Sequence, residues 1–127
     1  MSSRFEKHYT REEARAILPQ LREWLEKLEE LKAKHDKDQR RLTSLRNDGQ
    51  DLGGEAVNNS VRVMGEIQSL LREFEKREII IKDLDRGLVD FPALIGGKEV
   101  FLCWEKDEED VEYWHDLDSG FAGREPL

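Results

Sequence analysis

The sequence predicts an α+β protein: a long antiparallel helical hairpin packed on a small antiparallel β-sheet of three or four strands. Two long segments carry apolar residues every three or four positions, which is the spacing of one helical face. A glycine-rich stretch near 47–54 separates these segments and predicts a loop. Four short segments rich in Ile, Val, Phe and Trp follow, as is typical of strands.

The length of 127 residues suits one domain with one modest core. We expect a single domain over 1–127, in which 10–76 form the hairpin and 78–127 form the sheet and a C-terminal tail. Charged residues make up 39% of the chain, so much of it must be solvated surface of the kind that long exposed helices provide.

The net charge of -8 is unevenly distributed. Thr10 to Asn47 carry ten Lys/Arg against eight Asp/Glu, a net charge of +2, whereas Ile79 to Leu127 carry five against thirteen, a net charge of -8. The acidity therefore belongs to the C-terminal part. The helical region leaves room for a local basic patch.

The single cysteine, Cys103, cannot form an internal disulfide. The first residues, MSSRFEKHYT, contain no apolar run resembling a signal peptide, and no window approaches the 18 or so apolar residues that span a bilayer. We expect a soluble, cytoplasmic protein without membrane contact.

The first helix begins at a capping box formed by Thr10 and Glu13. Pro19 lies inside the helical pattern and predicts a bend, because it lacks the amide hydrogen and crowds the preceding turn. The turn-forming residues NDGQDLGG place the end of the helix near Arg46. The apolar stripe of this helix consists of Ala14, Ile17, Leu18, Leu21, Trp24, Leu25, Leu28 and Leu31.

Beyond Leu31 the pattern thins, and His35 and Asp38 enter the seam, as in a wet coiled coil. The second helix is predicted from about Glu55 to Lys76. Because it is shorter, the first helix around Ala14 to Leu25 must cover the sheet or another subunit. The predicted stripe of the second helix consists of Val57, Val61, Met64, Ile67, Leu71 and Phe74.

The strands are predicted at Glu78–Asp83, Leu88–Leu94, Glu99–Glu105 and Val111–Asp116. Gly96-Gly97 is a hairpin signal, and the acidic run at 105–110 predicts the exposed loop of the next hairpin. Pro92 marks an edge strand or a bulge, because proline cannot donate to a ladder.

The strand around Val100 to Trp104 is apolar on both faces. The helices can cover one face, and for the other we expect a second subunit, hence a homodimer. The tail at 117–127 carries two glycines around Phe121, which indicates irregular backbone anchored by an aromatic side chain.

Four blocks carry a family resemblance: TREEARAILPQLRE at 10–23, KDLDRGLVDFPAL at 82–94, GGKEVFLCWE at 96–105 and YWHDLDSGFAGREPL at 113–127. They resemble the signature blocks of a bacterial family catalogued as domain of unknown function 2203. The resemblance runs from the first helix to the end of the chain. It implies no activity or ligand.

One candidate site joins the acidic 83–90 segment to the 115–124 segment, because His and carboxylates are ligands of divalent metals and Asp pairs at i, i+2 point to one side of an extended segment. The alternative, which the residue types favour, is that these aspartates cap turns and form structural bridges. The candidate cluster comprises Asp83, Asp85, Arg86, Asp90, His115, Asp116, Asp118 and Arg124. A metal, if bound, would use Asp83, Asp85, His115, Asp116 and Asp118.

Arg86 and Arg124 lie next to glycines, where a planar guanidinium could bind a carboxylate or phosphate in bidentate fashion. The favoured alternative is a set of bridges to Asp85, Asp90 or Asp118. Cys103 with His115 is a candidate nucleophile and base. A free cysteine among aromatic residues is more often a small core residue.

The segment Lys32 to Arg46 carries six Lys/Arg against two Asp, a net charge of +4, and could contact phosphates. No aromatic residues alternate with these charges, so base stacking has no platform. A solvated helical face is the favoured interpretation.

These observations favour a non-enzymatic interaction or assembly module that acts as a homo-oligomer, with a protein partner as a further option. The first alternative is a metal- or phosphate-ligand-binding enzyme built from the 83–90 and 115–124 segments. The second is nucleic-acid binding through the basic arm. No cofactor is predicted for the module, and the enzyme hypothesis would take a divalent metal.

Overall fold

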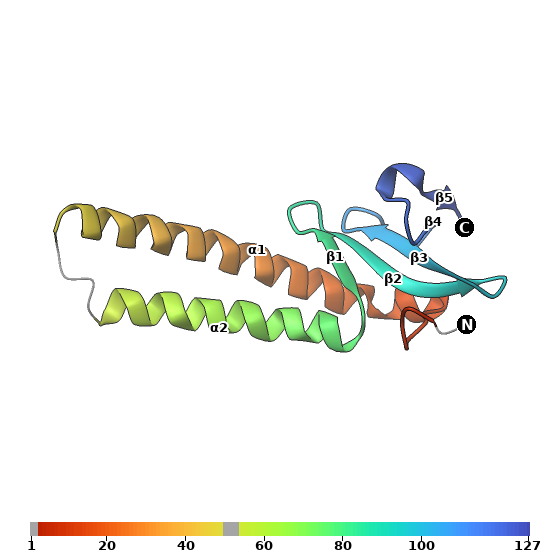
Figure 1. Cartoon of the computed structure of the whole chain (residues 1–127), viewed down its shortest axis with the longest axis horizontal. Coiled ribbons are helices and arrows are strands. Elements are labelled where there is room, and N and C mark those ends of the chain that lie inside the picture. The colour runs from red at the N-terminus through yellow and green to blue at the C-terminus, as the bar shows by residue number, and fades with distance from the viewer. Residues whose placement is uncertain (1–2, 50–53) are drawn as a thin grey trace.

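The computed structural model describes residues 3–49 and 54–127 and has the predicted α+β architecture (Figure 1). Two long helices form a hairpin, and the chain continues into an antiparallel sheet with strand order β1-β2-β3-β4-β5. The sheet has five strands rather than three or four. The elements are α1 (Arg11–Asn47), α2 (Glu55–Lys76), β1 (Ile80–Asp83), β2 (Leu88–Ile95), β3 (Lys98–Glu105), β4 (Tyr113–Asp116), the 3-10 turn η1 (Phe121–Gly123) and β5 (Glu125–Pro126).

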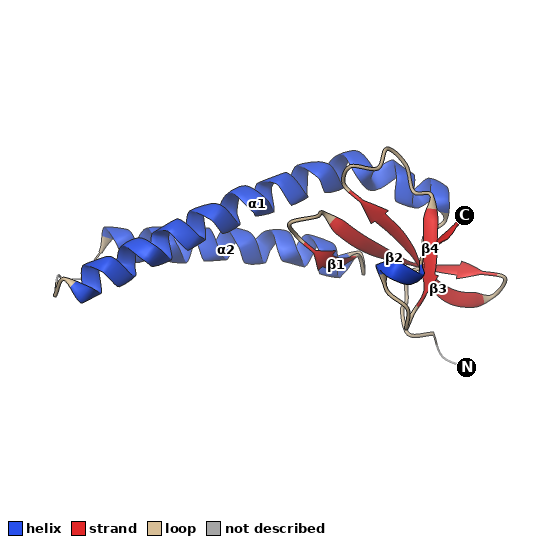
Figure 2. Ribbon diagram, turned by 90° about the horizontal axis from the view of Figure 1, so that it is seen from above, coloured by secondary structure: helices blue, strands red, loops and turns tan. Residues whose placement is uncertain are grey.

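Helix α1 starts at the predicted capping box, with the Glu13 amide donating to Thr10 Oγ1 and the Thr10 amide donating to Glu13 Oε1, both at 3.1 Å. Its first half covers one face of the sheet, and its second half projects away beside α2 (Figures 1 and 2). Pro19 lies on the exposed side and does not end the helix. The buried residues of α1 are Ala14, Leu18, Leu21, Leu25, Leu28 and Leu31, all within the predicted stripe.

Helix α2 has the predicted bounds, but much of its predicted stripe does not face α1. Ser60, Val63 and Phe74 are buried, and Gln39 of α1 donates a 3.0 Å hydrogen bond to Ser60 Oγ. Ile67 is partly buried against the core. In contrast, four members of the predicted stripe are exposed: Val57 (40%), Val61 (62%), Met64 (43%) and Leu71 (38%).

This difference has a simple cause. At about 100° per residue, the positions 60, 63, 67, 70 and 74 form one helical face, and the positions 57, 61, 64 and 71 form a second face roughly a quarter-turn away. Both faces are mainly apolar, so periodicity alone does not select the one that meets α1. The glycine-rich connection predicted near 47–54 falls partly at 50–53, outside the described residues.

The sheet is a simple meander whose first four strands match the predicted segments. Gly96 and Gly97 form the β2–β3 turn with φ of 58° and 79°, a conformation that favours glycine. Pro92 lies two residues beyond the last β1 pair, so β2 is locally an edge there. The Pro92 carbonyl accepts from the Tyr9 amide at 2.7 Å. The two-residue strand β5 was not predicted, because a tail containing glycines and a proline carries no strand pattern.

The two faces of the sheet are covered differently. Residues of α1 and α2 pack on one face around Phe91 and Trp104, each fully buried. The chain's own N-terminal residues and tail already cover the far face around Phe101 and Cys103, so these two side chains are buried within the single chain. Phe5 packs edge-on against Phe101, with ring centroids 5.4 Å apart. Phe101 and Cys103 are each 1% exposed in the single chain.

The projecting part of the hairpin has a thin core. Beyond Leu31, His35 and Asp38 lie half-buried in the seam, as predicted. The buried atoms His35 Nδ1 and Asp38 Oδ2 have no hydrogen-bond partner within residues 3–49 and 54–127. Neither α1 nor α2, over its described residues, is long and apolar enough to cross a membrane.

We predict that Leu21→Ala lowers the free energy of unfolding by about 2–5 kcal/mol, because it leaves a cavity where α1 meets the sheet. Leu94→Ala is the control, since Leu94 is 50% exposed and should cost about 1 kcal/mol or less. Urea denaturation followed by circular dichroism measures both. Equal losses for the two variants would contradict the packing described above.

Candidate functional site

Three chemically active side chains meet on the far face of the sheet: Asp90 of β2, Cys103 of β3 and His115 of β4. Asp90 and Cys103 are direct cross-strand partners, and His115 pairs with Phe101, two residues from Cys103. Side chains two residues apart on a strand share a face, so the register brings all three together. One ligand atom from each lies within 4.8 Å of the others. All three are buried, with 1–2% exposure.

The hydrogen bonds of His115 define how its ring is used. Nδ1 lies 2.7 Å from the Asp116 carbonyl oxygen, which can only accept, so Nδ1 carries a proton and donates. Nε2 lies 3.1 Å from Asp90 Oδ1. In the neutral imidazole, Nε2 therefore directs a lone pair at a carboxylate oxygen. These two acceptor atoms repel each other unless a proton or a metal cation is shared between them.

Burial raises the pKa of both other members of the cluster. The pKa of the Asp90 carboxyl rises although His115 opposes the rise, and Asp90 Oδ2 is buried with no hydrogen-bond partner among the described residues. Burial also raises the pKa of the Cys103 thiol to about 11, reinforced by Asp90 and opposed by Arg124. A protonated thiol with 1% exposure is a poor nucleophile, which argues against the catalytic Cys103–His115 pair.

Arg124 closes the site from the tail. Its guanidinium carbon lies 3.8 Å from the Tyr113 ring centroid and 4.3 Å from that of Phe121. Two nitrogens donate to Glu108 at 2.6 and 3.2 Å, forming a bidentate pair in which both side chains are more than four-fifths buried. Phe121 thus anchors the tail, as the sequence predicted.

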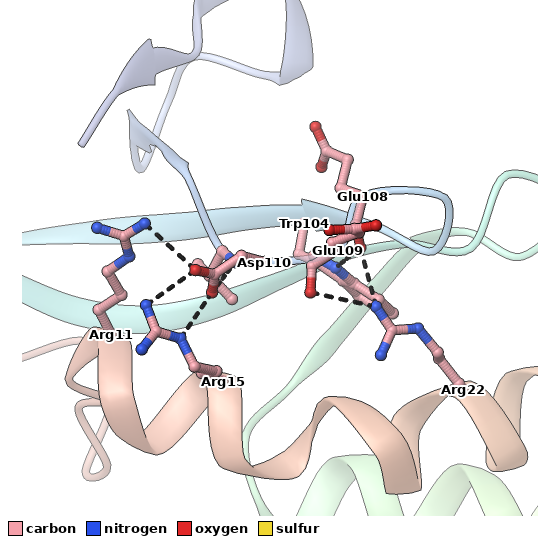
Figure 3. A network of polar contacts seen from close by, with 8 residues as sticks. Arg11, Arg15, Arg22, Trp104, Glu108, Glu109 and Asp110 are labelled. Carbon is pink, nitrogen blue, oxygen red and sulfur yellow. Dashed lines mark hydrogen bonds and ion pairs between the residues drawn. The ribbon is translucent and has the colours of Figure 1, made fainter.

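Glu108 is held in place from the helical side (Figure 3). Its backbone carbonyl accepts hydrogen bonds from Arg22 of α1 and from the Trp104 indole, both at 2.9 Å. Asp110, in the same loop as Glu108, accepts hydrogen bonds from Arg15 of α1 at both carboxylate oxygens, at 2.9 and 2.8 Å. The predicted exposed loop at 105–110 is therefore tied to α1.

The remaining members of the 83–90 segment lie outside this buried cluster. Asp83 accepts from the Arg86 amide at 3.2 Å, as a turn cap does. Asp85 is exposed and lies 3.3 Å from Lys32 of α1. Arg86 donates to Glu105 at 2.8 Å and stacks on Phe121 from 4.3 Å.

Asp116 and Asp118 point away from the buried site. Asp116 follows His115 on the strand, so its side chain lies on the opposite face, where it pairs with Lys98 at 2.8 Å. Asp118 is exposed and lines a shallow surface depression with these two residues. Of the predicted metal set, His115 alone joins the buried cluster.

Both arginines form ion pairs, as predicted, but their acidic partners are not the predicted ones. Arg86 and Arg124 pair with Glu105 and Glu108 rather than with Asp85, Asp90 or Asp118. Sequence reasoning missed both glutamates because an acidic run between strands predicts a solvated loop. The sequence did contain a signal for these bridges, because an acidic run also offers carboxylates to the arginines of neighbouring segments, here Arg86 and Arg124.

Comparison with known proteins identifies a family and no relative. The family described as "Uncharacterized conserved protein (DUF2203)" matches residues 7–127. No curated protein and no solved structure matches the chain.

We predict that Arg124→Lys makes the Cys103 thiol react roughly 5- to 30-fold faster with a disulfide reagent such as 5,5′-dithiobis(2-nitrobenzoate). Lysine keeps the charge but loses the planar fork to Glu108 and the stacking on Tyr113, so the tail opens more often. Lys98→Gln, which breaks an exposed ion pair elsewhere on β3, should leave the rate unchanged. An unaltered rate in Arg124→Lys would show that the tail does not control access.

We predict a pH-dependent contribution from Asp110, whose pKa is lowered mainly by its hydrogen bonds to Arg15. A depressed carboxyl pKa stabilises the fold above the unfolded-state value of about 4 and loses that effect as pH falls through the folded-state value. Asp110→Asn should therefore destabilise the protein at pH 7, and the difference from wild type should shrink below about pH 4. Urea denaturation across pH measures this, and a pH-independent difference would refute it. In a double-mutant cycle, Arg15→Gln should add little once Asp110 is replaced.

Proposed function

The chain belongs to the DUF2203 family, whose description names no activity, and we propose that it is a non-enzymatic module that assembles through a second copy of itself. We take this module to be soluble and cytoplasmic, as the sequence predicts. The observation that carries the proposal is the outer face of α2, defined by Val57, Val61, Met64 and Leu71, which is apolar and exposed in the single chain.

A helix that presents apolar residues on two faces needs two partners. The inner face of α2 has α1, and its outer face has none within the described residues. Large apolar side chains in a continuous stripe mark an association surface more often than isolated ones do. The thin core of the projecting hairpin adds to this, because two helices gain stability when a second pair completes a four-helix bundle.

The outer face of α2 continues into an apolar groove of about 390 Å³ at the base of the helix. Leu71 belongs to both, and the far side of the groove is formed by Phe5, Ile80 and Ile81. The latter two belong to β1, which is an edge strand of the sheet. Leu71 therefore links the outer face of α2 to the apolar groove beside the sheet.

Symmetry favours a second copy over another occupant. Val57 and Leu71 are each seven residues from Met64, so a two-fold axis at Met64 pairs them across an antiparallel contact between two α2 helices. The same arrangement brings the hairpin-tip end of the basic segment Lys32–Arg46 (net +4) of one copy toward the sheet end of the other. That end belongs to the acidic part of the chain, Ile79–Leu127 (net -8).

This charge pairing gives the basic segment a role that needs no nucleic acid. The structure adds no aromatic platform to the segment, so nucleic-acid binding remains the alternative expected from charge alone. Dimer formation that weakens with salt but persists in nuclease-treated protein distinguishes the two.

We predict that the wild-type chain is a dimer at micromolar concentration and that Met64→Glu is a monomer, because the variant places a charge on the two-fold axis. Ser69→Glu is the matched control: it adds the same charge to the same helix, but on a face pointing away from both apolar stripes. Size-exclusion chromatography with light scattering measures the mass of each. A monomeric wild type, or equal behaviour of the two variants, would refute the proposal.

The symmetry has its own test in cysteine cross-linking. Met64→Cys should form covalent dimers with a short bismaleimide, whereas Ser69→Cys should not. Wild type provides the background, because Cys103 is buried. Dimers from Ser69→Cys but not from Met64→Cys would place the axis elsewhere and overturn the arrangement.

A further inference from the structure

We propose that Asp90, Cys103 and His115 form a binding site for one divalent transition-metal ion, best matched to Zn²⁺. The site lies on the far face of the sheet beneath the tail, and the proposal is independent of the assembly through α2. It differs from the metal set predicted from sequence, which combined exposed aspartates with His115.

The donor atoms fit a borderline metal. A carboxylate, a thiolate and an imidazole are the three ligand types that Zn²⁺ accepts, and three protein ligands leave a fourth position for water or a second carboxylate oxygen. The ligand atoms lie within 4.8 Å of one another. A tetrahedral site needs about 3.3–3.8 Å between ligands at bond lengths of about 2.0–2.3 Å, so small side-chain adjustments close it.

The arrangement of the polar atoms in the cluster favours a bound cation. Asp90 is only 1% exposed, and its Oδ2 atom has no hydrogen-bond partner among the described residues. His115 Nε2 directs its lone pair toward Asp90 Oδ1, because Nδ1 donates to the Asp116 carbonyl at 2.7 Å. Metal-binding histidines commonly donate their second nitrogen to a carbonyl in this way, which fixes the ring.

The charges balance in a buried setting. A divalent ion with one carboxylate, one thiolate and a neutral imidazole has a net charge of zero, and burial of a neutral assembly costs less than burial of an ion. Arg124 lies near the Cys103 sulfur and raises the local positive charge, but Glu108 neutralises it through the bidentate pair. Arg124 thus closes the site without adding net charge.

In the competing account, a proton shared by Asp90 and His115 supplies the positive charge. It makes the cluster a structural hydrogen-bond network, in which Cys103 is a packing residue whose protonated thiol also donates to the Asp90 carboxylate. This account gives the thiol no role in binding a cation. The sulfur therefore distinguishes the two accounts.

The test uses the untagged full-length chain, stripped of metal by a chelator and titrated with Co²⁺ as a spectroscopic substitute for Zn²⁺. The chain has a single cysteine, so a thiolate-to-cobalt charge-transfer band identifies Cys103 as a ligand without any mutation. We expect this band, together with tetrahedral visible bands, to saturate at one Co²⁺ per chain and to disappear when Zn²⁺ displaces the cobalt. Saturating Co²⁺ without the thiolate band overturns the proposal.

Variants assign the other two ligands. Asp90→Asn and His115→Gln should each weaken Zn²⁺ binding about 100-fold or more, by competition with a chromophoric chelator. Asp118→Asn is the control, because this exposed carboxylate lies outside the cluster, and it should bind like wild type. Zn²⁺ should raise the melting temperature of wild type and of Asp118→Asn. Equal loss of binding in Asp118→Asn, or none in the two cluster variants, would assign the metal to surface carboxylates and refute the site.

Discussion

The central strand β3 is buried on both faces, and the rest of the chain is arranged to cover it. Val100, Leu102 and Trp104 pack toward the helices, while Phe101 and Cys103 point to the far face. The first requirement explains why α1 is longer than its partner helix, since its first half serves the sheet and its second half serves the hairpin. The second requirement explains why both ends of the chain fold back on the far side.

Carboxylates near the two ends of β3 hold that far-side cover in place. At its start, Glu99 accepts hydrogen bonds from the amides of Arg4 and Phe5 and lies 2.7 Å from His8 Nε2. Just after its end, Glu108 binds Arg124 of the tail. Part of the acidity of the C-terminal half is therefore structural, because it attaches the N-terminal residues and the tail to the sheet.

The sequence predicted what depends on local pattern. The helix bounds, the capping box, the Gly96-Gly97 turn and the anchoring role of Phe121 all follow from short-range chemistry and agree with the structure. The errors concern relations between distant segments. Periodicity does not decide which of two apolar faces of α2 meets α1. It also does not reveal that a tail without a strand pattern folds back over the far face of the sheet.

The candidate site shows the same division. Asp90, Cys103 and His115 were each singled out, but only the register of three strands shows that they meet. That meeting is costly for stability, because apolar residues fill the equivalent positions on the helix-facing side at no desolvation cost. Arg124 of the tail covers the three donors, next to the Cys103 sulfur and stacked on Tyr113. The outer face of α2 continues to β1, at the other edge of the sheet. The surface proposed for a second copy and the proposed metal site therefore lie on different parts of the fold, so the two proposals can be tested separately.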